Sequence, residues 1–240
     1  MSEKVSVAEE RLPDERANRP ITERRLARMQ GVLARRQPDV AVVVENVHDP
    51  HNVSAVLRSC DATGVPSAYL LYSVEDPPQL SKGVSASANR WLDIHRVESV
   101  DACYTELRAR GLTIYATTLG DGAVELYDLD LTQPCAFVFG NESRGVSDEA
   151  LERADERLRI PMAGMVDSLN ISVACAVILY EVFRQRRAAG HFDASAWDEE
   201  ERRQRLIDWL LREGRDPAAA MKADHGELPQ ARNRYTERAR

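Results

Sequence analysis

The pattern of apolar and polar residues divides the middle of the chain into alternating strands and helices. Residues 40–45 (VAVVVE) form a continuous β-branched run, which is typical of a strand buried on both faces. The same reasoning predicts further strands at 68–72, 112–117, 135–139 and 157–160, and helices at 52–63 and 100–110, each ended by a glycine. This alternation predicts an α/β fold with a mostly parallel sheet flanked by helices. Ligands are then expected beyond the carboxyl ends of the strands.

Both ends of the chain add helices outside this alternating region. Leu26, Met29 and Leu33 recur at steps of three and four residues, which predicts a helix with a narrow apolar stripe and a wide arginine face. A second amphipathic helix is predicted at 197–212. We therefore expect three parts, namely an N-terminal helical extension (1–38), a core domain (39–190) and a C-terminal helical extension (191–240).

A long helix predicted at 169–187 differs from the others. It is apolar nearly all round between Ile171 and Phe183, and a helix without a polar face must be covered on both sides. Because one sheet covers only one side, we expect the other side to form a subunit interface.

Charge and composition leave the class of partner open. The formal net charge is −7, which argues against nucleic acid, but nearly all of the 32 Lys and Arg residues are arginines. Seven arginines lie between residues 16 and 36 against one acid, Glu23. They fit contacts to phosphate and solvated helix faces equally well. The chain lacks an apolar leader and a long apolar run, so we expect a cytoplasmic protein that does not enter the membrane.

Several common site chemistries are not expected. The first strand is followed by no glycine-rich loop, and neither GxxxxGK[ST] nor GxGxxG occurs, so ordinary nucleotide binding is excluded. His48 and His51 supply two metal ligands at most, so no metal site is expected. The four cysteines form no CxxC pair and sit in apolar surroundings, which favours reduced thiols in the core.

Three polar segments follow predicted strands and carry the candidate chemistry. In the first, residues 46–64, we expect Asn52 to begin a helix and Arg58 to reach back toward the end of the strand. Arg58 has apolar neighbours on that helix, where an unpaired charge is costly, so a partner or ligand is expected for it. The alternative is a capping residue and a surface arginine.

The second and third segments also have an ordinary and a functional interpretation. FGNESRG at 139–145 leaves a strand as a polar loop between two glycines, which fits a ligand site and also fits a simple turn. Residues 160–170 enter the long helix and contain Ser168 and Asn170, both good N-caps. Capping explains one of the two and leaves the other for a different role.

Together, in this order, the three segments resemble the three motifs of the SPOUT class of RNA methyltransferases. The resemblance covers residues 40–187 and rests on N-x5-R-x5-G, on FGNE-x-x-G, and on IPM followed by SLN-x-S. The VENVHDPHN stretch, the arginine-rich first helix and the C-terminal extension are similar to the tRNA (guanosine-2′-O)-methyltransferases of the TrmH group.

This resemblance implies a fold, a cofactor and a set of site residues. The fold would be a SPOUT sheet with a C-terminal deep trefoil knot, assembled as a homodimer. S-adenosyl-L-methionine would bind in loops of the knot, lined by Thr117, Thr118, Gly140, Ile160, Met162 and Leu169. The implied catalytic residues are Asn52, Arg58, Glu142, Ser168 and Asn170. The tRNA would be held by arginines of the C-terminal extension and by Arg24, Arg25, Arg28, Arg35 and Arg36.

The implied reaction is methyl transfer to the ribose 2′-hydroxyl of guanosine 18 in the tRNA D-loop. A hydroxyl is a weak nucleophile, so it needs proton removal and in-line placement. Arg58 is a poor base because guanidinium stays protonated in proteins, and we expect it instead to hold an RNA phosphate and align the 2′ oxygen. The alternatives are a ribosomal RNA 2′-O-methyltransferase and a non-catalytic RNA-binding or folding-assistance protein.

Overall fold

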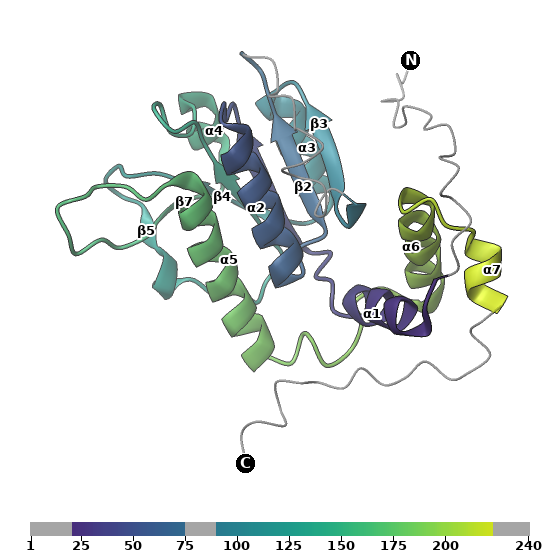
Figure 1. Cartoon of the computed structure of the whole chain (residues 1–240). Coiled ribbons are helices and arrows are strands. Elements are labelled where there is room, and N and C mark those ends of the chain that lie inside the picture. The colour runs from purple at the N-terminus through teal and green to yellow at the C-terminus, as the bar shows by residue number, and fades with distance from the viewer. Residues whose placement is uncertain (1–20, 75–89, 223–240) are drawn as a thin grey trace. The chain divides into compact units, whose positions relative to one another are not determined.

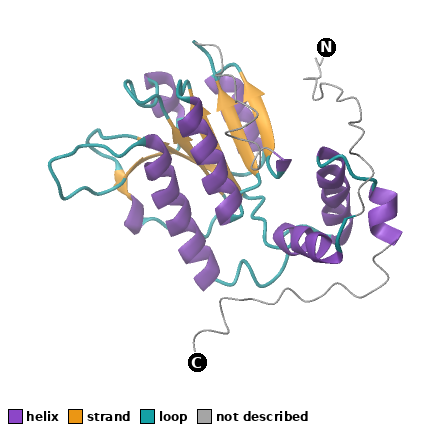
Figure 2. Ribbon diagram, in the orientation of Figure 1, coloured by secondary structure: helices purple, strands orange, loops and turns teal. Residues whose placement is uncertain are grey.

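The computed structural model of the chain describes residues 21–74 and 90–222. The described residues form two compact units, one within Val32–Glu199 and one that combines residues 21–31 with residues 200–222. The larger unit contains the strands β1 (Val40–Glu45), β2 (Ser67–Leu71), β3 (Asp93–Val97), β4 (Thr113–Thr117), β5 (Val124–Glu125), β6 (Cys135–Phe139) and β7 (Glu156–Arg159). Its helices are α2 (Pro50–Thr63), α3 (Val100–Ala109), α4 (Asp148–Arg153) and α5 (Ile171–Ala188), with a short 3-10 turn at Leu126–Asp128 (Figures 1 and 2).

The seven strands form one sheet in the order β3-β2-β1-β6-β4-β7-β5, and every pairing is parallel. The mostly parallel α/β sheet predicted from the sequence is thereby confirmed. Strand β6 lies between β1 and β4, and the chain leaving β7 returns to α5, which packs against α2. The segment between β7 and α5 therefore crosses back along the carboxyl edge of the central strands. The trefoil knot implied by the resemblance stays a prediction.

Helices cover both faces of the sheet, and the alternation along each strand explains why. In β1, Val40, Val42 and Val44 belong to the cluster that contains the buried residues of α2 and α5. Ala41 and Val43 point to the other face, into the cluster formed with α3 and α4. All six residues of β1 are buried, as expected of a strand that has both faces covered.

The predicted elements differ from the observed ones mainly at the edges of the sheet. Strand β3 was not predicted, because its sequence DIHRV is polar and its side chains are only partly buried. Strand β5 has two residues, and the six-residue helix α4 was also missed. Helix α2 begins at Pro50 and is capped by Asp49, whose Oδ1 accepts from the His51 N–H at 2.8 Å. The expectation that Asn52 begins this helix is therefore wrong, because the Asp-Pro pair supplies the cap and the first turn.

The second unit is helical. Its helices are α1 (Glu23–Leu33), which continues to the start of the larger unit, α6 (Glu199–Arg212) and α7 (Pro217–Lys222). The two expected amphipathic helices are present, and their apolar residues Leu26, Met29, Leu206, Trp209 and Leu210 are buried. An ion pair between Arg25 and Glu213 links the two segments of this unit. The predicted contributions of Arg16, Arg19 and the arginines after residue 222 lie outside the described residues.

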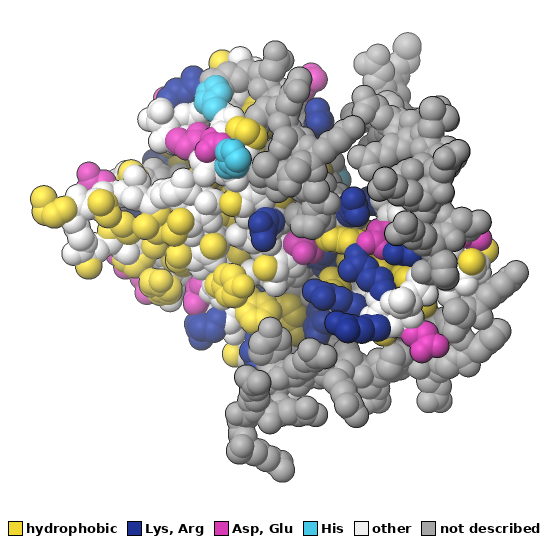
Figure 3. Space-filling model, in the orientation of Figure 1, with side chains coloured by type: hydrophobic (Ala, Val, Ile, Leu, Met, Phe, Trp, Pro, Cys, Tyr) yellow, Lys and Arg dark blue, Asp and Glu magenta, His cyan; other side chains and the backbone are white. Residues whose placement is uncertain are grey.

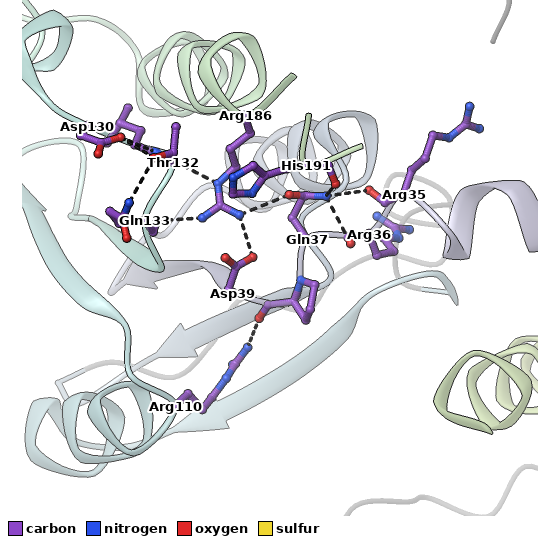
Figure 4. A network of polar contacts seen from close by, with 12 residues as sticks. Arg35, Arg36, Gln37, Asp39, Arg110, Asp130, Thr132, Gln133, Arg186 and His191 are labelled. Carbon is purple, nitrogen blue, oxygen red and sulfur yellow. Dashed lines mark hydrogen bonds and ion pairs between the residues drawn. The ribbon is translucent and has the colours of Figure 1, made fainter. Parts of the chain in front are cut away.

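The end of α5 is fixed to the start of β1 by a buried arginine. Arg186 has a fully buried side chain and forms an ion pair of 2.6 Å with Asp39. Its guanidinium also donates to Gln37 Oε1 and to the carbonyl oxygens of Leu131 and Gln133, at 2.7 to 3.2 Å (Figure 4). Arg186 thus holds three chain segments together at the end of the sheet opposite the carboxyl edge.

Candidate active site

The carboxyl ends of the central strands bring most of the expected site residues to one edge of the sheet. In a parallel sheet these ends lie side by side, and the order β1-β6-β4-β7 places them next to one another. The expected cofactor residues follow three of these strands: Thr117 and Thr118 at the end of β4, Gly140 after β6, and Ile160 and Met162 after β7. The expected catalytic residues lie on α2 (Asn52 and Arg58), in the loop after β6 (Glu142) and in the segment that enters α5 (Ser168 and Asn170).

Three of the expected catalytic residues form a continuous hydrogen-bonded chain. Asn52 Nδ2 donates to Glu142 Oε1 at 2.8 Å, and Asn170 Nδ2 donates to Asn52 Oδ1 at 3.1 Å. Asn170 also caps α5, because its Oδ1 accepts from the Ser172 N–H at 2.9 Å and from the Ser172 hydroxyl at 2.6 Å. Asn170 is therefore the residue that caps α5, and the separate role expected for Ser168 stays a prediction. We call Glu142, Asn52, Asn170 and Ser172 the amide relay.

The loop that carries Glu142 is closed on itself. Asn141 and Gly145 exchange two backbone hydrogen bonds, of 2.9 and 2.8 Å. A Cβ on Gly140 would lie 2.0 Å from the Gly145 carbonyl carbon, so only glycine fits there. Gly145 itself has φ +71°, which also favours glycine. The two glycines expected to be either turn or site residues are therefore required by the geometry of the loop that presents Glu142.

Sequence reasoning missed the polar residues that support this loop. Asn141 Nδ2 donates to the Asn46 carbonyl at 2.8 Å, and Asn46 has φ +48°, the sole positive φ among the described non-glycine residues. Glu45 is buried and accepts from the N–H and the hydroxyl of Ser147 at 2.9 and 2.6 Å. The signal available was polarity itself, since Glu45 ends an otherwise apolar strand and Asn46 follows it directly.

Arg58 and Ser168 lie outside the amide relay. The Arg58 side chain is exposed and makes no hydrogen bond or ion pair with the described residues. The expectation that Arg58 needs a partner because it is desolvated is therefore wrong, since Val53, Val56, Leu57 and Cys60 turn the apolar side of α2 inward and leave Arg58 in solvent. Its guanidinium is free to meet a ligand. Ser168 is likewise exposed and unpartnered within the described ranges.

The loop between β7 and α5 has the character of a ligand-binding segment. Residues 161–168 are all exposed, and no hydrogen bond ties them to other described residues. Met165 is 99% exposed, and Met162, Val166 and Leu119 add further exposed apolar surface. Figure 3 shows hydrophobic side chains gathered along α5 and the loop that precedes it. Free backbone groups beside apolar side chains suit a flat, uncharged base such as adenine, so these residues fit S-adenosylmethionine.

The two threonines at the end of β4 are already engaged with neighbouring strands. Thr117 Oγ1 donates to the Val138 carbonyl at 2.9 Å, and the Thr118 N–H donates to the Leu158 carbonyl at 2.9 Å. They join the ends of β4, β6 and β7. Their remaining polar groups, including the Thr118 carbonyl, are positioned at the same edge as the open loop.

The expected RNA-binding arginines have different surroundings. Arg24, Arg28 and Arg35 are exposed, whereas Arg25 is half-buried beside Glu213. Arg36 is 1% exposed, forms an ion pair of 2.6 Å with Asp61, and donates to the Trp91 carbonyl at 3.2 Å. Burial lowers the pKa of Arg36, and the Asp61 carboxylate opposes that shift. Arg36 was expected to contact RNA, and this expectation is corrected, because its guanidinium is enclosed by the protein.

Other expectations concern thiols, metals and membranes. All four cysteines are buried free thiols, as predicted, and burial raises the pKa of Cys103 and of Cys135 to about 12. Within residues 21–74 and 90–222, no three metal-binding side chains cluster together. In the same ranges no helix is both long enough and apolar enough to cross a bilayer.

The sequence matches the SpoU rRNA Methylase family over residues 39–180. It is 45% identical over 189 residues to the tRNA (guanosine(18)-2'-O)-methyltransferase of Thermus thermophilus, covering 79% of this chain and 97% of that protein. The enzyme of the same name from Escherichia coli is 40% identical over 207 residues, with 85% and 88% covered. A 23S rRNA (guanosine-2'-O-)-methyltransferase, RlmB of Pseudomonas syringae pv. tomato, is 37% identical, with 63% and 60% covered.

Solved structures agree with these matches. The A. aeolicus TrmH/SpoU tRNA modifying enzyme superimposes with a TM-score of 0.75 at 38% identity, covering 80% of this chain and 97% of that one. The SpoU methyltransferase AviRb from Streptomyces viridochromogenes, solved in complex with the cofactor AdoMet, has a TM-score of 0.57 at 29% identity, with 63% and 62% covered.

Proposed function

This chain belongs to the SpoU methylase family, and we propose that it transfers a methyl group from S-adenosyl-L-methionine to the ribose 2′-hydroxyl of guanosine 18 in tRNA. The observation that carries the proposal is the amide relay, which joins the three family motifs at one edge of the sheet beside an open loop. The tRNA enzymes match over nearly their whole length, whereas the ribosomal RNA enzyme matches over 60% of its own. That difference favours tRNA as the substrate.

The residues present divide the work of the reaction. S-adenosylmethionine supplies an electrophilic methyl carbon on its sulfonium. The loop at 161–168, Gly140 and Leu169 would hold its adenine and ribose through backbone groups and apolar contact. Asn52 and Asn170 fix the Glu142 loop relative to the start of α5, so the two sides of the site keep a constant spacing.

Arg58 is suited to holding the RNA rather than to removing a proton. Its guanidinium is exposed, has five N–H donors in a planar fork, and stays protonated at any physiological pH. It lies on α2, further along the same helix than Asn52, and can therefore contact a phosphate while the adjoining ribose meets the relay. We assign it the task of aligning the 2′ oxygen.

The exposed arginines of α1 and of the turn that follows it would bind the tRNA body. Arg24 and Arg28 belong to the helical unit, and Arg35 lies at the start of the larger unit. Each phosphate contact releases counterions, so removing Arg24 and Arg28 should reduce the salt dependence of tRNA affinity by about two units of slope. The affinity for S-adenosylmethionine should not change, and this can be measured by calorimetry on the same variant.

The exposed side of α5 supports the proposed homodimer. Val173 and Tyr180 are 47% and 54% exposed, on a helix whose other side packs on α2 and the sheet. A second copy of the same helix is a surface that would cover both side chains. Tyr180→Arg should yield a monomer by light scattering, while Leu211→Arg, at an equally exposed apolar position on α6, should leave the mass unchanged.

One experiment tests the main proposal. Purified protein is incubated with labelled S-adenosylmethionine and total tRNA, and the modified nucleotide is mapped. We expect a 2′-O-methyl group at guanosine 18. We also propose that the protein acts in the cytoplasm. Methylation of a base, or of ribosomal RNA alone, would refute the assignment, and RNA binding without methyl transfer would favour the non-catalytic alternative.

A further inference from the structure

The amide relay has a fixed direction. The backbone N–H of Ser172 can only donate, and it donates to Asn170 Oδ1 at 2.9 Å. Asn170 must therefore turn its Nδ2 toward Asn52, which accepts through Oδ1 at 3.1 Å. Asn52 in turn presents Nδ2 to Glu142 Oε1 at 2.8 Å. The cap of α5 therefore fixes the orientation of both asparagine amides. As a result the last donor of the relay, Asn52 Nδ2, faces an oxygen of Glu142, which accepts.

This direction has a consequence for Glu142. Oε1 is already engaged, because it accepts the hydrogen bond from Asn52. Oε2 has no hydrogen-bond partner among the described residues, and the side chain is exposed at the carboxyl edge of the sheet. The relay therefore holds the carboxylate by one oxygen and leaves the other oxygen available to an incoming hydroxyl.

The chemistry of the neighbouring residues narrows the choice of proton acceptor. Arg58 is permanently protonated, and the amides of Asn52 and Asn170 do not take up a proton at physiological pH. The Ser168 hydroxyl is itself no stronger as a base than the ribose hydroxyl. Of the five catalytic residues that the family motifs indicate, Glu142 alone can accept a proton. Outside that set, four exposed groups are rivals: His48 and Asp49 in the turn after β1, His51 in the first turn of α2, and Asp167 in the open loop.

We propose that Glu142 Oε2 accepts the proton of the ribose 2′-hydroxyl during methyl transfer, an assignment that rests on the function proposed above. The O–H bond breaks and its proton forms a bond with Oε2. The electron pair of the 2′ oxygen forms the new bond to the methyl carbon, and the pair of the broken carbon–sulfur bond stays on sulfur. The exposed carboxyl group then returns the proton to water. Asn52 and Asn170 act through Glu142 as positioning residues.

The first test separates proton acceptance from loop ordering. Glu142→Gln keeps the shape, and its amide oxygen can still accept from Asn52, so only the capacity to take a proton is lost. We expect the single-turnover rate of methyl transfer to fall about 10²- to 10⁴-fold, with the affinities for tRNA and S-adenosylmethionine changed less than about threefold. Glu152→Gln, an exposed glutamate on α4 with no partner among the described residues, is the matched control and should keep the wild-type rate.

The second test needs no methyl donor. RNA fragments carrying either the 2′-hydroxyl or a 2′-deoxy sugar at the target guanosine are titrated onto the apo protein. A hydroxyl that donates to the carboxylate should make wild type prefer the hydroxyl form by about tenfold, because a hydrogen bond to a charged group contributes about that much. Glu142→Ala should abolish the preference, and a deoxy sugar at the next nucleotide should have no effect in either protein.

The outcomes are distinct. A Glu142→Gln rate within about threefold of wild type, or equal wild-type affinity for the two RNA fragments, would overturn the assignment. A comparable loss of rate in His48→Gln, Asp49→Asn, His51→Gln or Asp167→Asn, with Glu142→Gln active, would transfer the role to that residue. A wild-type protein that methylates no tRNA would instead refute the proposed function itself, and this assignment with it.

Discussion

Replacing the buried Arg186 is the sharpest test of how the larger unit is held together. Arg186→Met removes the donor of four hydrogen bonds and leaves Asp39, Gln37 and the carbonyls of Leu131 and Gln133 without this partner. Removing one member of a buried ion pair costs about 3–5 kcal/mol. The Asp39 side chain is 35% exposed, so solvent screens part of that loss, and we expect about 3 kcal/mol.

Urea unfolding followed by circular dichroism measures the effect. With an m value of about 2 kcal/mol per M, the midpoint should fall by roughly 1.5 M. Arg186→Lys retains the charge but cannot serve four acceptors at once, so it should lose about 1–2 kcal/mol. Arg187→Met, at the exposed next position of α5, should change stability by less than about 0.5 kcal/mol. The reasoning fails if Arg186→Met matches Arg187→Met, or if lysine restores full stability.

Three further predictions concern the site and its supporting helix. Arg58→Lys keeps the charge but loses the planar fork, so tRNA methylation should fall at least about tenfold with cofactor affinity unchanged; near-normal turnover would count against the phosphate contact. Gly140→Ala forces a Cβ to within 2.0 Å of the backbone of its own loop and should sharply lower both cofactor affinity and the melting temperature, whereas Gly120→Ala, with its nearest neighbour at 3.4 Å, should be tolerated. The hydrogen-bonded Arg184 guanidinium lowers the pKa of Glu181 below 4.5, so this group adds stability above about pH 4.5 that is lost as the pH falls through its folded-state value. Acid titrations of stability should therefore be less steep in Glu181→Gln.

The order of strands and helices could be predicted because buried parallel strands have a strong signature. VAVVVE and CAFVF are continuous apolar runs, and both form central strands with every residue buried. The edge strand β3 gives no such signal, since its DIHRV side chains are only partly buried, and among the described strands it pairs only with β2. Where the local sequence pattern is weak, pairing with a neighbouring strand therefore determines that the segment forms a strand.

The predictions about the surroundings of Arg58 and Arg36 were wrong for different reasons. For Arg58 the signal was present: residues 53, 56, 57 and 60 repeat at helical spacing, so position 58 falls on the opposite side of α2. For Arg36 no local signal existed. Its burial depends on Asp61 and on the Trp91 carbonyl, 25 and 55 residues away in the sequence. A run of arginines in the sequence therefore indicates an RNA-binding surface only once the structure shows which of the side chains are exposed.

Three members of the amide relay could be predicted from the sequence, but the order of their hydrogen bonds could not. The motifs indicated Asn52, Glu142 and Asn170, yet 90 and 118 residues separate the pairs that touch, and their hydrogen bonds exist only because β6 lies beside β1 and the chain returns from β7 to α5. What the structure adds is the direction of these hydrogen bonds. A helix cap has one possible donor direction, two asparagines pass that direction on, and Glu142 is left with one oxygen bound and one oxygen free. Three hydrogen-bonded side chains could equally serve only to hold the Glu142 loop in place. The direction of donation leaves one Glu142 oxygen free to accept, and this favours the role of proton acceptor.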